Sequence, residues 1–475
     1  MSVASDGPDP RDAGASYDVI VVGGGHAALS AALSARRTAA RVLILERAPR
    51  HMRGGNSRHT RNVRCAHDPG DAYLTGEYGE DEFLDDLRNV GGGQLDAALA
   101  RFAVRESKLL PAWMTAHGVG WQRALRGTLS LSRTNRFFLG GGKALVNTYY
   151  ETCRRLGVEV RYESSVADIR MAGRRAEAVV VDCGGSRTLV RGHAVVVAAG
   201  GFEANLDWLR RYWGDAADNF AVRGTPYNDG TMLAVLLDKG AMQVGDPKGF
   251  HAIAVDARAP KYDGGIATRL DSIPFGIVVN RVGERFSDEG EDLWPKRYAT
   301  WGARVAAQPG QIAYSIVDAK AIGCFLPPLY KPVQADSVAA LAARLQIDAG
   351  ALVRTVDDYN RATVGNTAFR ADVLDGLATR GLRPAKSNWA RPLDRPPFSA
   401  LPLRPGITFT YMGVGVDETA RVVDRHGQPF VNLYAAGEIM SGNILASGYL
   451  AGFGMTIGGV FGRLAGREAA THAGH

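Results

Sequence analysis

The segment from Tyr17 to Glu46 constrains the fold more than any other part of the chain. The apolar run YDVIVVG (17–23) predicts a strand buried on both faces. The turn GGGHAA (23–28) has the GxGxxA pattern and opens into helix formers, and a second apolar run, RVLILE, ends at Glu46. This order brings backbone N–H groups and a positive helix end to a pyrophosphate, and an acid to a ribose. It predicts a dinucleotide site, and the acid disfavours NADP.

Three further glycine signatures lie downstream of this segment. Gly54-Gly55-Asn56-Ser57 follows Glu46, VVVAAGG (195–201) ends one predicted strand, and VNLYAAGE (431–438) ends another. An NAD domain is usually one continuous block, whereas these pieces must converge from distant parts of the chain. The spacing therefore favours FAD, bound by a nucleotide domain that an insertion divides.

The charge pattern bears on the second ligand. The net charge is +7, and the densest basic stretch runs from Arg47 to Arg64. It is interrupted by glycines and lacks Lys-rich runs with interleaved aromatics, so a small anion fits better than a polyanion, and we expect no nucleic-acid partner. The four cysteines form no CxxC pair, which argues against a zinc or iron–sulfur site and fits a reducing compartment. Residues 1–16 lack the apolar core of a signal peptide and are expected to be a disordered tail.

Motifs over nearly the whole chain resemble those of the fumarate reductase/succinate dehydrogenase flavoprotein family. They are GGNS (54–57), AAGGFE (198–203), the Asp229-Gly230 pair, VNRVGERFSDE (279–289), AAGE (435–438) and FGRLAG (461–466). Within that family, GGNSRHTRNVR, NRFFLGGGKAL, EGEDLWPKRYATWG and ITFTYMGVG are most similar to the tricarballylate dehydrogenases.

The resemblance implies an α/β fold, with a split Rossmann-like FAD-binding domain around a central parallel sheet and an inserted α+β capping domain. The expected boundaries are 17–247 and 405–475 for the two parts of the FAD-binding domain, and 248–404 for the cap. The cap would close over the flavin and gate turnover.

The uncharged stretch from Ile439 to Gly462 allows two interpretations. It is long enough to cross a bilayer and contains GxxxG spacings. The resemblance instead places it in a helix of the FAD-binding domain whose positive N-terminus faces the flavin. Seven glycines are costly in an exposed helix but permit close approach, and the stretch carries several polar side chains. We therefore expect a flavin contact and not a membrane span.

The glycine motifs and the resemblance together define the residues expected to bind FAD. They are Gly23, Gly25, Ala27, Ala28, Glu46, Arg47, Gly54, Gly55, Asn56, Ser57, Gly141, Gly142, Lys143, Val166, Ala199, Gly200, Gly201, Asp229, Gly437, Glu438, Gly454, Met455 and Thr456. Relatives with covalent FAD use a His in the region of His59, but the spacing does not match, so we expect non-covalent FAD.

The implied reaction is desaturation of a small polycarboxylate, tricarballylate to cis-aconitate, with a hydride passing to flavin N5. Pairing the carboxylates with cations makes the adjacent C–H bond easier to ionise, and the planar fork of Arg suits that task. Electrons would leave to quinone through a membrane-bound iron–sulfur/cytochrome partner. The protein is accordingly expected in the cytoplasm, peripheral to the inner membrane through that partner.

The resemblance places an acid/base Arg shortly after the GERFSDE element. Leu293 occupies the ungapped position, so we expect this role for Arg297, with Lys296 as the alternative. His251 and Thr268 align with residues that bind a substrate carboxylate in the family.

Three positions depart from fumarate reductases. Arg269 replaces an acid of their proton path, Tyr449 replaces a clamp arginine, and TFTYMG (408–413) lacks their carboxylate-binding His. Replacement cations could come from Arg58, Arg61, Arg64, Arg133 and Arg136. Three alternatives stay open. One is a flavin 3-ketosteroid dehydrogenase, for which Tyr411 and Tyr449 could polarise a ketone. The others are a fumarate reductase-type enzyme and a non-catalytic flavin-binding redox subunit.

Overall fold

The computed structural model describes residues 16–39, 41–91, 95–124, 131–262, 268–365 and 368–474, without the side chains of residues 295 and 296. The predicted N-terminal tail, apart from Ser16, and the side chain of Lys296 therefore lie outside the described residues.

A parallel sheet forms the centre of the nucleotide-binding part, as expected. Its order is β21-β9-β1-β2-β6, with β20 antiparallel at one edge and a β7–β8 hairpin extending antiparallel from β9. The strands are β1 (Tyr17–Val22), β2 (Val42–Leu45), β6 (Glu159–Arg161), β7 (Ser165–Ala172), β8 (Arg175–Cys183), β9 (Ser186–Val197), β20 (Arg421–Val423) and β21 (Pro429–Ala435). The four residues of β2 are all buried, and β1 is nearly so, which is why these strands read as continuous apolar runs.

Helix α12 (Phe453–Ala473) packs directly against α1 (His26–Ala35). A Cβ on Gly462 would lie 2.5 Å from the Ala27 carbonyl oxygen, and one on Gly466 would lie 2.1 Å from that of Ala31. Only glycine permits this approach of two helix backbones.

The uncharged C-terminal stretch is therefore organised differently from the single helix that we expected. A 3₁₀ segment, η10 (Gly437–Asn443), and irregular chain precede α12, which begins after Gly452 in the left-handed region (φ 80°). Several of its glycines serve helix packing and not ring contact. No helix in the described part of the chain is long and apolar enough to cross a membrane.

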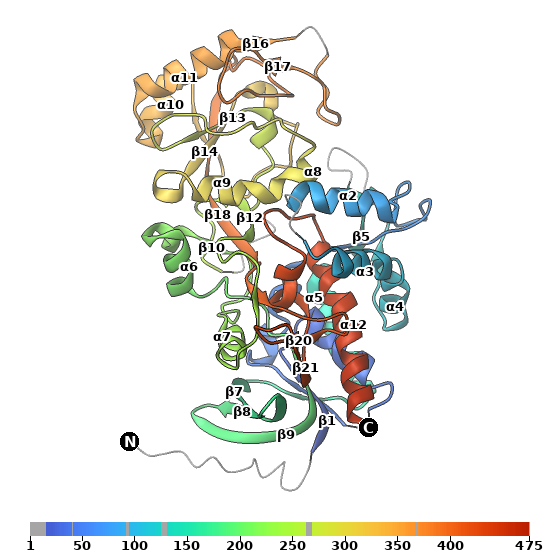
Figure 1. Ribbon diagram of the computed structural model, residues 1–475. Coiled ribbons are helices and arrows are strands. Elements are labelled where there is room, and N and C mark those ends of the chain that lie inside the picture. The colour runs from blue at the N-terminus through green and yellow to red at the C-terminus, as the bar shows by residue number, and fades with distance from the viewer. Residues whose placement is uncertain are drawn as a thin grey trace.

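A second sheet is built around the 13-residue strand β18 (Phe398–Thr410). Its other strands are β10 (Ala221–Val222), β12 (Phe250–Asp256), β13 (Ile277–Asn280), β14 (Ala313–Val317) and β15 (Val333–Ala335). Figure 1 shows α10 (Val338–Leu345), α11 (Ala349–Ala362), β13 and β14 at one end of the molecule and β1, β7, β8 and β9 at the other, with β18 between them. The α10–α11 layer has its own apolar core. The domain boundaries of the sequence analysis stay predictions.

The remaining elements surround these two sheets. They are β3 (Asn62–Arg64), α2 (Glu80–Gly91), α3 (Ala97–Ser107), α4 (Leu110–Ala116), β4 (Trp121–Gln122), β5 (Asn135–Phe138), α5 (Gly141–Arg155), α6 (Leu206–Trp213), α7 (Thr231–Asp238), β11 (Gln243–Val244), α8 (Trp294–Arg297), α9 (Trp301–Ala306), β16 (Thr363–Val364), β17 (Ala378–Thr379) and β19 (Gly413–Val414).

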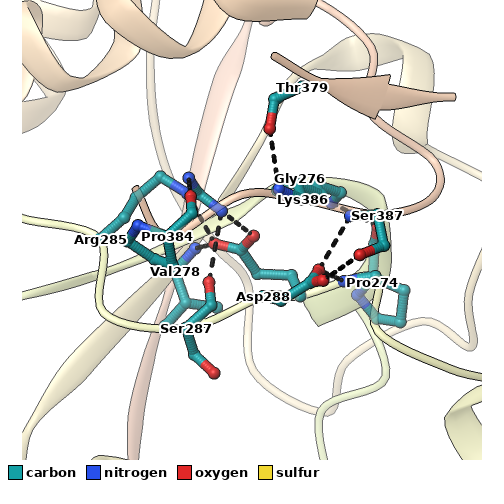
Figure 2. A network of polar contacts seen from close by, with 12 residues as sticks. Pro274, Gly276, Val278, Arg285, Ser287, Asp288, Thr379, Pro384, Lys386 and Ser387 are labelled. Carbon is teal, nitrogen blue, oxygen red and sulfur yellow. Dashed lines mark hydrogen bonds and ion pairs between the residues drawn. The ribbon is translucent and has the colours of Figure 1, made fainter. Parts of the chain in front are cut away.

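We call the part of the chain around β13, β14, β15, α10 and α11 the cap. A buried polar network joins segments of this part (Figure 2). Arg285 forms an ion pair with Glu289 at 2.5 Å, and their side chains are 4% and 0% exposed. Fully buried Lys386 donates from Nζ to the Pro274 oxygen at 2.6 Å and also to the Gly276 oxygen. Burial lowers the pKa of Lys386 to about 8. Glu289 Oε1 also accepts from the N–H of Val278 at 2.8 Å, and Arg285 Nη1 donates to the Pro384 oxygen at 2.6 Å. These buried charges therefore fix the relative position of the segments that carry their partners.

We predict that Glu289→Ala destabilises the cap by about 3–5 kcal/mol, because it leaves the buried Arg285 charge uncompensated. Urea unfolding followed by tryptophan fluorescence measures this loss. Glu284→Ala, an exposed neighbour, is the matched control and should change stability by less than about 0.5 kcal/mol. Equal midpoints for the two variants would contradict the prediction.

Candidate active site

One cavity extends from the glycine turns of the parallel sheet to His251, Arg269 and Tyr298. Its empty volume is about 1630 Å³, including the open mouth. Seventeen of the residues expected to bind FAD line it, although they come from distant parts of the chain. They are Gly23, Gly25, Ala27, Glu46, Arg47, Gly55, Asn56, Ser57, Val166, Ala199, Gly200, Gly201, Asp229, Gly437, Glu438, Gly454 and Met455.

The nucleotide end of the cavity is shaped by close backbone packing. Gly23 has φ 108°, and a Cβ there would lie 2.4 Å from the Ala198 oxygen. Ser57 Oγ accepts a hydrogen bond from the backbone N–H of His26 at 3.0 Å, which fixes the GGNS turn at the start of α1. The turn and the helix N-terminus therefore form a cradle of backbone groups suited to a pyrophosphate.

Glu46 is held at the end of β2 by backbone donors. Its Oε1 accepts from the N–H of Ala48 at 2.9 Å and its Oε2 from that of Gly54 at 3.3 Å. Burial raises its pKa, and these donors and Arg47 oppose the rise. Arg47 Nη1 in turn bonds Asp229 Oδ1 at 2.6 Å, which joins the β2 end to the start of α7.

Six of the residues expected to bind FAD do not line the cavity: Ala28, Gly54, Gly141, Gly142, Lys143 and Thr456. Their positions explain why. A Cβ on Gly142 would lie 2.1 Å from the Ser57 oxygen, so this glycine supports the GGNS turn from behind. Gly54 supplies the N–H that reaches Glu46, Lys143 is exposed, and Thr456 Oγ1 donates to the Arg64 oxygen at 2.5 Å.

Three guanidinium groups line the other end of the cavity, those of Arg61, Arg223 and Arg269. Arg269 is held by Asp271 through two contacts of 2.8 Å, and Arg223 Nη1 donates to Thr408 Oγ1 at 2.9 Å. Burial and the charges of Arg269 and Arg61 lower the pKa of Arg223 to about 10, and burial and Arg269 lower that of Arg61. The three cations line one cavity, and their mutual repulsion favours an anion between them.

His251 stands beside these cations. Its ring stacks on Tyr449 at 3.9 Å, and Tyr298 lies edge-on to it at 6.1 Å. His251 is 5% exposed, and neither ring nitrogen has a hydrogen-bond partner among the described residues. Burial and the Arg223 charge hold its pKa well below the usual value, so the imidazole is neutral. A buried imidazole aimed at a cavity in this way is suited to a polar ligand.

The structure separates the other predicted catalytic residues from this group. Arg297 does not line the cavity; its Nε faces Glu291 and Asp292 at 3.8 and 3.9 Å. The next residue, Tyr298, lines the cavity instead. Thr268 is buried outside the lining, where its carbonyl accepts from the N–H of Asp256.

The five arginines proposed as replacement clamps differ in whether they line the cavity. Arg61 lines the cavity, whereas Arg58, Arg64, Arg133 and Arg136 do not. Arg133 pairs with Glu82, Arg136 pairs with Asp71, and the other two bond neighbouring groups. Sequence reasoning missed Arg223. Its signal was a lone cation that directly follows the apolar run FAV (220–222) and precedes the Asp229-Gly230 pair.

The backbone cradle and the buried acid at the end of β2 fit a flavin dinucleotide, and they define a nucleotide-binding flavoprotein. The FAD binding domain family matches residues 18–452, so the chain belongs to that family, and it is an FAD-dependent oxidoreductase.

Particular relatives can be named. The chain is 28% identical over 96% of its length to a probable fumarate reductase of Shewanella frigidimarina, of which it covers 75%. It is 27% identical over 96% of its length to an NADH:fumarate oxidoreductase of Klebsiella pneumoniae, and spans 48% of that protein. Its fold matches that of a 3-ketosteroid-Δ4-(5α)-dehydrogenase of Rhodococcus jostii with a TM-score of 0.75 and 22% identity, over 98% of this chain and 100% of the other.

We predict that stability falls at low pH through His26, which stacks on Tyr149 beneath the glycine turn. Burial lowers the pKa of His26 from 6.5 to about 4. Between pH 6.5 and about pH 4 this histidine is protonated in the unfolded chain but neutral in the folded chain. The free energy of unfolding therefore decreases as the pH falls through this range. This linked free energy amounts to about 3 kcal/mol. The melting temperature of His26→Gln should fall less steeply with acid than that of the wild type; identical slopes would contradict the assignment.

Proposed function

We propose that this protein desaturates a small polycarboxylate at a C–C bond next to a carboxylate, with tricarballylate as the first substrate to test. The observation that carries this proposal is the convergence of Arg61, Arg223 and Arg269 on one cavity with the neutral His251. Arg269 already bonds Asp271 through Nε and Nη2, so it adds positive charge but not a second two-bond fork. Together with this charge, the guanidiniums of Arg61 and Arg223 suit a ligand with more than one carboxylate better than a monocarboxylate or a ketone.

The arginines, His251 and Tyr298 have different roles in the proposed reaction. The guanidiniums bind and orient the carboxylates, and their charge stabilises the carbanion character that develops beside a carboxylate. His251 donates or accepts one further hydrogen bond. Tyr298 lies among these cations, and it is our candidate for the proton-accepting role that the sequence suggested for Arg297. FAD, when bound, supplies the hydride acceptor.

Tyrosines in the site bear on the steroid alternative. Tyr449 lines the cavity, and its hydroxyl accepts the N–H of Gly454 at 2.9 Å, which leaves its own O–H able to donate to a ligand. The hydroxyl of Tyr411 is fully buried and donates to the Gly448 oxygen at 2.9 Å, away from the cavity. The two tyrosines do not converge to polarise one ketone, which supports the carboxylate substrate.

The names of the relatives support a carboxylate substrate. The Shewanella and Klebsiella proteins are named for fumarate, a dicarboxylate. We propose that the electrons pass to a separate iron–sulfur/cytochrome partner at the membrane, and that FAD is held without a covalent bond. Release of FAD into the supernatant on acid precipitation tests the second point.

Anaerobic mixing with candidate substrates tests the reaction class. We expect tricarballylate to bleach the flavin absorbance of the holoenzyme, and succinate to do so less effectively, because it engages fewer guanidiniums. Bleaching by a 3-ketosteroid alone would assign the protein to the steroid class. A flavin that no substrate reduces, but dithionite does, would support a non-catalytic redox subunit.

Substitution of single arginines tests the assignment of the cavity. We predict that Arg223→Met lowers kcat/KM about 10- to 100-fold, since a charge-assisted hydrogen bond contributes about 1.5–3 kcal/mol. KM should rise because the carboxylate is bound less tightly, and kcat should fall because the developing carbanion is stabilised less. Arg297→Met is the matched control, because Arg297 does not line the cavity, and it should keep the parental kcat/KM. Loss of turnover in Arg297→Met with parental activity in Arg223→Met would restore the sequence-based assignment.

A further inference from the structure

Two glutamates meet behind the wall of the cavity. Glu203 follows the AAGG turn at the end of β9, and Glu438 lies in η10. They are 0% and 9% exposed, and their side chains lie close enough to influence each other. Glu438 lines the cavity, while Glu203 stands behind it.

The neighbouring donors point to one oxygen of each carboxyl. Glu203 Oε1 accepts from Nδ2 of Asn56 and, at 2.8 Å, from Nδ2 of Asn228. Glu438 Oε1 accepts from the N–H of Thr410 at 2.7 Å and from its Oγ1 at 3.1 Å. Glu203 Oε2 is buried and accepts from none of the donors that the structure describes.

The Glu438 carboxyl is the neighbouring group that could satisfy Glu203 Oε2. An ionised carboxylate is only an acceptor, so two carboxyl groups can bond each other only when one carries a proton. A hydrogen bond within the pair therefore requires one protonated member.

The electrostatic surroundings agree with this requirement. No ion pair joins either glutamate to a cation in the described part of the chain. Of the titratable groups on the adjoining elements, Tyr449 feels the Glu438 charge, and Arg223 bonds Thr408 on β18. Asp229 and Tyr411 directly follow the donors Asn228 and Thr410. Burial without a countercharge raises the pKa of both carboxyls.

We propose that Glu203 and Glu438 share one proton at neutral pH, and that Glu203 is a positioning residue that links this proton to the electrons held by the bound FAD. With the proton the pair carries one negative charge, and without it two. A second negative charge at the cavity wall opposes addition of electrons to the cofactor. By linkage, reduction of the cofactor raises the proton affinity of the pair. The pair then takes up a proton from solvent on reduction and releases it on oxidation.

The inference rests on FAD binding and not on the identity of the substrate, so it is tested without substrate. The flavin midpoint potential of the holoenzyme is measured against pH for the wild type and for Glu203→Gln, whose amide keeps the hydrogen bond to Glu438. We expect the wild-type curve to show an additional steeper segment where the pair loses its proton. The variant should coincide with the wild type at lower pH, since both carry one charge, and lack that segment at higher pH.

Infrared spectroscopy provides a second readout that does not depend on the potential. The wild type should show a protonated-carboxyl band that shifts in D₂O and disappears as the pH rises. Glu203→Gln and Glu438→Gln should each lose it, and the exposed control Glu284→Gln should keep it. A band that persists in both variants, or potential curves of the same shape in wild type and Glu203→Gln, would overturn the proposal. If Glu203→Gln does not fold, the same measurements are made on Glu438→Gln, which replaces the other carboxyl of the pair with an amide and carries the same expectations.

Discussion

The close packing of α12 on α1 is the contact on which the rest of the nucleotide site depends. The glycines of α12 let its backbone rest on that of α1, at the carbonyl oxygens of Ala27 and Ala31. This contact joins the last helix of the chain to the first, and it brings Gly454 and Met455 to a cavity that begins at Gly23. An added methyl group at Gly462 or Gly466 would separate the two helices and open the cradle between them.

The parallel sheet and the nucleotide site could be predicted from the sequence because their signals are local. A buried strand, a glycine turn and a terminal acid follow one another within the segment from Tyr17 to Glu46, and backbone geometry dictates each step. The role of the C-terminal glycines was less accessible. A glycine that approaches a ring and one that approaches another helix look alike in sequence, since both satisfy the same need for space.

The cap end was harder to predict because its side chains come together only through tertiary contacts. Arg297 and Tyr298 are neighbours in sequence, yet Tyr298 lines the cavity while Arg297 faces Glu291 and Asp292. A short helix turns adjacent side chains in different directions, and alignment across an insertion cannot fix that rotation. Arg223 belongs to no recognised motif; it reaches the cavity because β10 pairs with β18.

The continuity of β18 has a mechanical consequence. Its first half pairs with β14 and β15 in the cap, while near its other end the Thr408 oxygen accepts from Asn56 and Thr410 donates to Glu438. An extended strand in a hydrogen-bonded ladder transmits tilt but hardly stretches. A substitution that changes the tilt of β18 at β14 or β15 should therefore also move the contacts with Asn56 and Glu438, so the two ends of this strand cannot be engineered independently.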